Sequence, residues 1–422
     1  MLRWRIAALV SAAIAISYLD RQALPVAIGA IERDIPVTNE QFSFLQSSFL
    51  VSYALMYAAG GRLMDVIGTR AGFIVIMVFW SLACASHGLA SSVTMLAISR
   101  FLLGMGEGGG FPAATRAVAE WFPVHERSTA MGIVNAGTAV GGVLAPPLIA
   151  LVLTRFDWPV VFYLTAAAGI AWTLWWAREY FVPAAHPRLS SSERQLLAPV
   201  LASSAAQETP PGWLTLLRIR QTWGLVTAKC LSDAAWYFYL FWLPKYLYDA
   251  RGFDIKTVGA LAWMPHAAAF AGCLAGGWFS SWLLTRAVSL DRARKIALGA
   301  SAAVMPAVLL IPNAPIAWAI AIFCLAYLGQ QSWSTLVMIL PADIYPRGAV
   351  GAVAGLVGFG GAMGGIVFGQ VVGYLLDHGH GYGVVFALAG SFHVIAFAVI
   401  CIVIPRIVPL APVAGAPAAT SS

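Results

Sequence analysis

Charged residues are scarce in this chain of 422 residues, where Asp, Glu, Lys and Arg make up only 10%. An average soluble domain carries about 25% charged residues. With 60% hydrophobic residues and a mean hydropathy of +0.79, the sequence excludes a soluble globular enzyme and predicts an all-α polytopic membrane protein. The net charge of +7 therefore indicates basic loop anchors beside a lipid bilayer, not a nucleic-acid partner.

Cysteine is also scarce, and the five cysteines lie in apolar runs without metal-ligand spacing or a pairing pattern. We expect small core residues there, no metal and no cofactor. No nucleophile–base set appears, which argues against an enzyme. The N-terminal stretch MLRWRIAALVSAAIAIS has the basic start and apolar run of a signal peptide. It lacks a small-residue cleavage site, so the sequence predicts an uncleaved first helix.

Apolar runs long enough to cross a bilayer, which takes roughly 20 residues, recur along the chain. They predict twelve transmembrane helices, at 6–30, 42–62, 71–91, 93–117, 128–153, 159–180, 221–247, 256–284, 294–312, 315–340, 349–376 and 381–404. The long polar stretch 181–220 is predicted to be a cytoplasmic linker between a first six-helix half, 1–180, and a second, 221–404. The tail 405–422 is predicted to be disordered.

The basic residues indicate the orientation. If both termini are cytoplasmic, 17 of the 25 Lys and Arg residues lie on the cytoplasmic side and five in outer loops. The positive-inside rule therefore predicts a multi-pass protein of the cell (inner) membrane with both termini in the cytoplasm.

The two halves contain an internal repeat. The stretch 120–142 aligns with 343–365 at a constant offset of 223, which matches Pro123 with Pro346, Gly132 with Gly355 and Gly137 with Gly360. Two parallel repeats of six helices are typical of a transporter that works by alternating access.

GRLMDVIGTR (61–70) resembles the loop 2–3 signature of the major facilitator superfamily, although Val66 stands where a basic residue is usual. SRFLLGMGEGGGFPAATRAVAEWFPVHERSTAMG (99–132) and YLDR (18–21) resemble the anion:cation symporter family, and FYLFWLPKYL (238–247) resembles its hexuronate transporters. The resemblance covers essentially the whole chain and implies the major facilitator fold.

Ionisable residues inside the predicted spans are the strongest functional candidates, because charge within a bilayer is costly. At 1.5 Å per residue, Asp20 lies about 22 Å into the first span and Arg100 about 10 Å into the fourth from the other face. These depths predict that Asp20 faces Arg100, with Glu107 about 10 Å below it on the same face. Purely structural ion pairs between the two helices are the alternative.

Charge accounting suggests the roles. An Asp20–Arg100 pair leaves Arg21 and Glu107 without partners, and an unpaired buried charge is strongly unfavourable. A substrate anion satisfies Arg21 and a proton neutralises Glu107. The resemblance implies the same division, with Asp20 and Glu107 as protonation sites and Arg21 and Arg100 serving substrate binding and coupling.

Lys229 and Asp233 lie four residues apart on the seventh span and so share a face. They are predicted to form a structural pair or a substrate or gating contact. Asp65 with Arg70 and Glu120 with Arg127 are candidate gating charges in cytoplasmic loops. Polar and aromatic side chains suited to line a sugar-acid site are Tyr18, Tyr53, Tyr57, Asn135, Thr138, Trp236, Tyr237, Tyr239, Gln330, Gln331, Ser332, Trp333 and Ser334.

The sequence thus favours a proton-coupled symporter for a small organic anion, most like a hexuronate such as glucuronate or galacturonate. Another carboxylate (an aldonate, glucarate or an aromatic acid) is the alternative of the same class. A transporter-like membrane sensor is the alternative of a different class. We expect a monomer whose partners are the substrate anion, protons and lipid.

Overall fold

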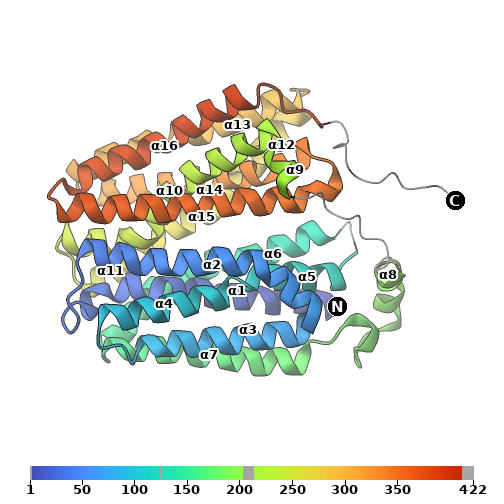
Figure 1. Ribbon diagram of the computed structural model, residues 1–422, viewed down its shortest axis with the longest axis horizontal. Coiled ribbons are helices and arrows are strands. Elements are labelled where there is room, and N and C mark those ends of the chain that lie inside the picture. The colour runs from blue at the N-terminus through green and yellow to red at the C-terminus, as the bar shows by residue number, and fades with distance from the viewer. Residues whose placement is uncertain (1, 124–125, 203–212, 411–422) are drawn as a thin grey trace. The chain divides into compact units, whose positions relative to one another are not determined.

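The computed structural model describes residues 2–123, 126–202 and 213–410. Within these ranges every regular element is a helix (Figure 1). The first seven helices are α1 (Leu2–Ile31), α2 (Asn39–Ile67), α3 (Thr69–His87), α4 (Val93–Glu107), α5 (Gly110–Trp121), α6 (Arg127–Leu153) and α7 (Trp158–Glu179). Three short elements follow: η1 (Pro183–Ala185), α8 (Ser191–Ala202) and α9 (Trp213–Leu217).

The later helices are α10 (Arg220–Asp249), α11 (Ile255–Leu261), α12 (Trp263–Thr285), α13 (Leu290–Ala303), η3 (Met305–Asn313), α14 (Ile316–Ile344), α15 (Arg347–Asp377) and α16 (Gly381–Val403). Each of the twelve predicted spans corresponds to one helix or to two consecutive helices. Within the described ranges, nine segments are long and apolar enough to cross a membrane. The other three predicted spans correspond to α2, to α10 and to the α4–α5 pair.

Local sequence signals explain several helix ends. Thr38 begins α2 with a capping box, because its hydroxyl accepts from the backbone N–H of Gln41 while the Gln41 side chain accepts from Thr38 N–H. Ser92 caps α4 through the N–H of Met95. Gly68 separates α2 from α3 with a φ of +77°, a backbone conformation that glycine adopts without a steric penalty.

The repeat in the sequence is matched by repeated helix packing. A Cβ added to Gly137 or Gly141 on α6 would strike the backbone oxygens of Ser11 and Ala15 on α1. In the second repeat, a Cβ on Gly360 or Gly364 of α15 would strike the backbone oxygens of Val226 and Cys230 on α10. Small residues therefore bring α6 close to α1, and α15 close to α10, through the same spacing of glycines.

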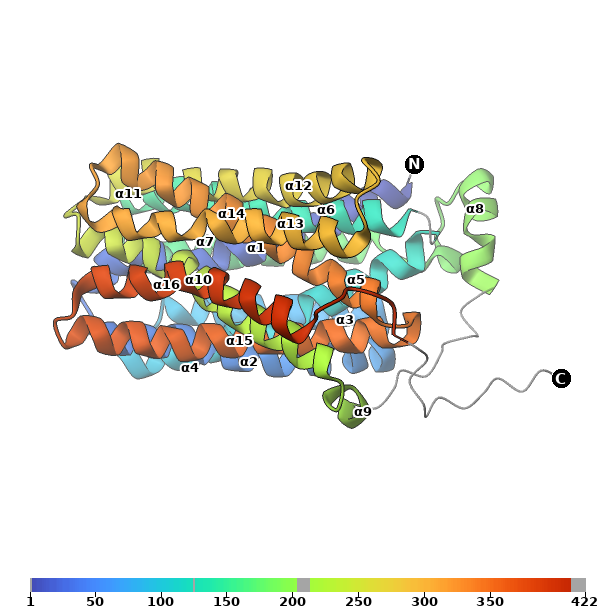
Figure 2. The same ribbon diagram turned by 90° about the horizontal axis from the view of Figure 1, so that it is seen from above.

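Two compact units can be distinguished by their internal packing. Unit 1 comprises Met1–Ala206, Leu240–Ala267 and Val372–Asp377, and unit 2 comprises Gln207–Tyr239, Ala268–Val371 and His378–Ser422. In unit 1, α1 packs against α6 and α7, and α3 lies beside α7 (Figure 1). In unit 2, α13 packs against α14 and α16 (Figure 2). The division into halves at 181–220 stays a prediction.

Candidate functional site

Asp20, the acidic residue of the YLDR motif, is hydrogen-bonded to α3. Asp20 is 1% exposed; its carboxylate accepts a hydrogen bond from Trp80 Nε1 at 2.6 Å and one from Cys84 Sγ at 3.4 Å. Among the described residues, no lysine or arginine forms an ion pair with Asp20. Unit 1 therefore contains a fully buried carboxyl group that is hydrogen-bonded but forms no ion pair with a described lysine or arginine.

Arg21, the basic residue of the motif, contacts α4 instead. Arg21 Nε donates to Glu107 Oε2 at 2.7 Å, and the side chains of this ion pair are 5% and 0% exposed. Ser17, one turn earlier on α1, donates to the same oxygen at 2.5 Å. Adjacent residues of a helix point about 100° apart, so Asp20 and Arg21 have different partners, as the sequence predicts.

The expected pairing of Asp20 with Arg100 is wrong. Arg100 is fully buried, and its Nη2 donates to the backbone oxygen of Arg21 at 3.3 Å. Its Nε and Nη1 have no hydrogen-bond partner among the described residues. The depth estimate ignored how each helix is rotated about its axis, and that rotation directs Asp20 towards α3 and Arg21 towards α4.

Aromatic rings surround the guanidinium of Arg21. Its Cζ lies 4.5 Å from the ring centre of Tyr53, 4.9 Å from Tyr18 and 5.3 Å from Phe49. Tyr53 also lies 6.0 Å from Tyr57, ring centre to ring centre. Three of the predicted lining tyrosines therefore gather at the Arg21–Glu107 pair, where Arg21 is stabilised by cation–π contacts.

Among the described residues, no hydrogen bond joins the predicted polar residues of α6 to this cluster. Thr138 donates to the backbone oxygen of Asn135 at 2.8 Å, a contact within the helix, and Asn135 is exposed. Their role in substrate binding stays a prediction.

A second buried polar cluster lies in unit 2. Lys229 and Asp233 on α10 form an ion pair at 2.9 Å, and Lys229 also donates to Ser334 Oγ on α14 at 2.8 Å. Gln330 on α14 donates to Asp233 at 3.4 Å, and its oxygen accepts from His393 of α16. The predicted pair is therefore part of a network that links three helices.

The remaining predicted lining residues of unit 2 make hydrogen bonds and ring contacts within that unit. Ser332 donates to the backbone oxygen of Gly272 on α12 at 2.8 Å, and Trp333 lies edge-on to His393. Trp236 packs edge-on against Tyr327. Cys273 Sγ donates a hydrogen bond to the side-chain oxygen of Gln331, and the Tyr327 hydroxyl donates to the backbone oxygen of Tyr239. Tyr237 is half-buried.

Charges also gather where α5 ends. Glu120 accepts from Thr69 at 2.6 Å, Arg116 at 3.1 Å and Tyr180 at 2.5 Å. The repeat counterpart of Glu120, Asp343 in unit 2, is paired with Arg294 at 2.8 Å.

The other predicted gating charges are described only in part. Arg70 donates to the backbone oxygen of Ala177 and stacks 4.1 Å from the ring of Phe181. The side chains of Asp65 and Arg127 lie outside the described part of the structure.

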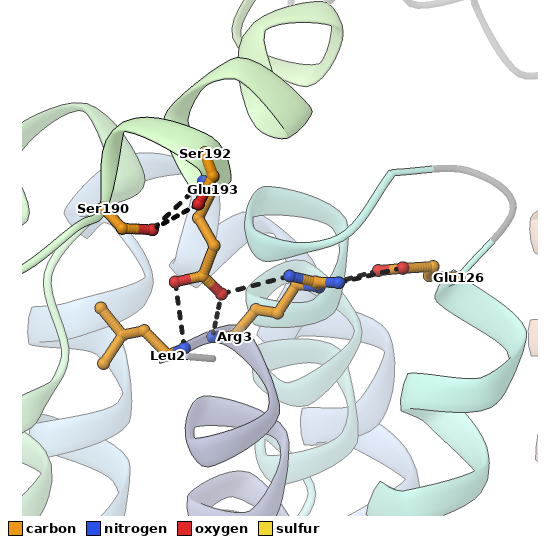
Figure 3. A network of polar contacts seen from close by, with 6 residues as sticks. All are labelled: Leu2, Arg3, Glu126, Ser190, Ser192 and Glu193. Atoms are coloured by element: carbon orange, nitrogen blue, oxygen red, sulfur yellow. Dashed lines mark hydrogen bonds and ion pairs between the residues drawn. The ribbon is translucent and has the colours of Figure 1, made fainter.

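Sequence reasoning missed the network at the start of α1. Figure 3 shows Glu193 of α8 accepting from the backbone N–H groups of Leu2 and Arg3, whose guanidinium bridges Glu193 and Glu126. Burial raises the pKa of Glu193, but hydrogen bonds from the N–H groups of Leu2 and Arg3, the charge of the N-terminal amine and a hydrogen bond from the Arg3 side chain outweigh it, so the net shift is downward. Part of the predicted linker is therefore docked on unit 1.

Three further residues that the sequence did not single out hold the charges of unit 1: Ser17, Trp80 and Cys84. Ser17 lies one helical turn before Arg21, and this spacing could have predicted that the two side chains share a partner. Trp80 and Cys84 carried no such signal, because apolar runs contain both residue types for packing alone.

A model of the Major Facilitator Superfamily matches residues 10–369 of this sequence. The chain belongs to the Major Facilitator Superfamily. It is accordingly a multi-pass membrane transporter and not an enzyme, and its helices adopt the fold of that superfamily.

Curated relatives are similar over most of their length. The hexuronate transporter of Escherichia coli (strain K12) is 29% identical over 407 residues, which cover 94% of this chain and 93% of that protein. The galacturonate transporter of Dickeya chrysanthemi is 34% identical over 283 residues, covering 66% of this chain and 81% of that protein.

A solved structure shows the same fold at low sequence identity. The bacterial homologue of the human lysosomal transporter Spinster, in an inward-facing and occupied conformation, superposes with a TM-score of 0.73. The two sequences are 16% identical, with 96% of this chain and 97% of that one covered. At this identity the likeness supports the fold alone.

Proposed function

We propose that this transporter is a proton-coupled symporter that imports a sugar-acid monoanion, a hexuronate such as glucuronate or galacturonate, by alternating access. The names of the curated relatives support the substrate class. We place the protein in the inner membrane as a monomer, with both termini cytoplasmic, in keeping with the distribution of basic residues.

The observation that carries the proposal is the charge imbalance of the buried cluster in unit 1. Arg21 is compensated by Glu107, whereas among the described residues Arg100 has two nitrogen donors without hydrogen-bond partners and Asp20 forms no ion pair. A buried carboxylate without a cation is so costly that it takes up a proton instead. With Asp20 protonated, the cluster carries one net positive charge, which suits a substrate with a single carboxylate.

The Arg21–Glu107 pair supplies the coupling step. We propose that a substrate carboxylate that binds Arg21 displaces Glu107, since both compete for the same guanidinium. The displaced Glu107 is then a buried anion whose cation is shared with the substrate, so it binds a proton. Substrate arrival and proton uptake thus occur together and leave the net charge of the buried cluster unchanged.

Two protonatable carboxyl groups also suit the energetics of anion import. Moving one negative charge into a cell with a negative interior costs about 2.3 kcal/mol per 100 mV. One proton per substrate anion cancels that cost, and a second makes the transported complex positive, so that the membrane potential drives uptake. Asp20 and Glu107 are the two proposed proton sites.

The test is uptake by the purified full-length chain in liposomes with an acidic exterior. Labelled glucuronate and galacturonate are compared with an aldonate, glucarate and an aromatic acid; empty liposomes and a protonophore are the controls. We expect hexuronate accumulation that the protonophore abolishes. Accumulation of another acid alone contradicts the hexuronate assignment, and binding without any uptake favours a membrane sensor.

A further inference from the structure

The two carboxyl oxygens of Asp20, within unit 1, face different kinds of donor on α3. Trp80 Nε1 donates to Oδ2 at 2.6 Å, and Cys84 Sγ donates to Oδ1 at 3.4 Å. An indole N–H can only donate a hydrogen bond, whereas a thiol can donate one or accept one weakly. A proton on Oδ2 would point at the Trp80 N–H, so Oδ1 is the oxygen that can bind a proton without losing a hydrogen bond.

Trp80 is held firmly where it meets Asp20. Its side chain is 1% exposed, and α4 approaches it closely at Gly106, where an added Cβ would lie 2.5 Å from Trp80 Cβ. Gly106 directly precedes Glu107, so the contact that fixes the indole lies beside the other proposed proton site. Oδ2 of Asp20 therefore keeps its donor whether the carboxyl group is ionised or protonated.

Cys84 has a second acceptor on α7. Its Sγ lies 3.1 Å from Thr165 Oγ1, and the Thr165 hydroxyl donates to the backbone oxygen of Phe162 at 3.2 Å. Because the Thr165 proton is used in that bond, its oxygen is free to accept from the Cys84 thiol. Rotation about the Cβ–Sγ bond thus lets the thiol donate to Asp20 or to Thr165.

Other ionisable side chains surround Asp20: His87 on α3, Arg21 on α1 itself, and Arg100 and Glu107 on α4. Arg21 and Glu107 are paired with each other at 2.7 Å. His87 bonds to backbone oxygens of its own helix, and Arg100 donates to the backbone oxygen of Arg21. On α6 and α7 the charged residues lie only at one end of each helix. The side chains that donate to Asp20 are therefore Trp80 and Cys84.

We infer that Trp80 and Cys84 position the coupling proton on Oδ1 of Asp20, Trp80 by occupying Oδ2 and Cys84 by exchanging a donor role for an acceptor role. The inference rests on the proposed function, since it takes Asp20 as a proton site. A proton from water forms one O–H bond at Oδ1, and the thiol keeps its own proton. The Cys84 S–H turns to Thr165, and its sulfur accepts from the new O–H group. Both are positioning residues, because they act through Asp20.

The test is infrared difference spectroscopy of the full-length protein in liposomes, between neutral and acidic pH. The unaltered protein should gain the C=O stretching band of a protonated carboxyl group, which Asp20→Asn should lack. In Trp80→Phe the band should lie at higher frequency, because the C=O at Oδ2 has lost its donor. Its titration midpoint, and with it the pH dependence of galacturonate uptake, should rise by about one pH unit, since a charged acceptor gains more from a hydrogen bond than a neutral one.

The thiol gives a second signal. On acidification the S–H stretching band of Cys84 should move to higher frequency, because the donor exchanges a charged acceptor for a neutral one. Cys84→Ala and Asp20→Asn should both lack this change. Trp172→Phe is the matched control, because Trp172 is another buried indole of unit 1 that donates to α1, at the backbone oxygen of Leu9 and 2.8 Å. It should leave both bands and the midpoint unchanged.

The outcomes separate the two claims. If the Asp20 band appears but Trp80→Phe changes neither its frequency nor its midpoint, or the S–H band does not follow the titration, the inference is overturned. If Trp80→Phe does not give a monodisperse protein, the S–H band of the unaltered protein is the deciding measurement. If no Asp20-dependent band appears at the pH at which galacturonate accumulates, Asp20 is not a proton site, and the proposed function fails at that residue.

Discussion

Replacing Glu107 by Gln should separate substrate binding from proton coupling. The change keeps the shape of the side chain but removes the negative charge that holds Arg21 at 2.7 Å and accepts from Ser17 at 2.5 Å. The Arg21 guanidinium then has no competing carboxylate. A hydrogen bond to a charged group contributes about 1.5–3 kcal/mol, so galacturonate should bind about tenfold to a hundredfold more tightly.

The same change should lower accumulation driven by the proton gradient, because it removes one of the two proposed proton sites. Each coupled proton contributes about tenfold accumulation per pH unit, and a glutamine takes up no proton at neutral pH. The variant should still exchange internal for external substrate, because exchange needs no net proton movement. We expect the unaltered protein to bind galacturonate more tightly as the pH falls. The variant should lose this pH dependence of its affinity.

The variant should be less stable without substrate, because removing one partner of a buried ion pair costs about 3–5 kcal/mol. The assays are substrate-dependent thermal shift, gradient-driven uptake and counterflow in liposomes. Glu179→Gln is the matched control, since Glu179 pairs with Arg188 at 2.8 Å at a helix end and should be dispensable for coupling. Normal accumulation by Glu107→Gln refutes the proposed role of Glu107.

Three further predictions address other parts of the molecule. Arg21→Lys should weaken substrate affinity by about tenfold, because lysine cannot present the guanidinium fork to a carboxylate; an unchanged dissociation constant contradicts this. Glu193 has a pKa lowered from 4.5, so its stabilising effect is complete above that pH and is lost on acidification below it. Glu193→Gln should lower the melting temperature at neutral pH and flatten its fall in acid, whereas parallel curves show that the contact with α1 is unimportant. Gly141→Ala should destabilise by about 1–3 kcal/mol, because its Cβ meets the backbone oxygen of Ala15, while Gly132→Ala, with open space around it, should be neutral or stabilising in thermal unfolding.

The sequence predicted the helical spans well, because each is a long apolar run whose length is set by the bilayer. It also identified the buried charges, since an ionisable residue in such a run is conspicuous. The repeat of Gly137 with Gly360 was visible in the sequence, and the structure explains it by close packing of α6 on α1 and of α15 on α10.

The partners of the buried charges were predicted less well. Residue spacing gives depth along a helix but not the rotation of one helix against another, so Asp20 was assigned to Arg100 instead of Trp80. Break points within spans were also missed, such as Gly108–Gly109 between α4 and α5. The docking of Glu193 on Arg3 joins residues 190 positions apart, and no local pattern predicts such a contact.

The most direct test of the central claim is whether protons enter together with the sugar acid. Galacturonate is added outside liposomes that contain the purified transporter and a trapped pH indicator, with the membrane potential clamped. The account predicts internal acidification that accompanies labelled galacturonate entry and is smaller for each galacturonate that enters in the Glu107→Gln variant. Entry of labelled galacturonate without any change in internal pH contradicts it.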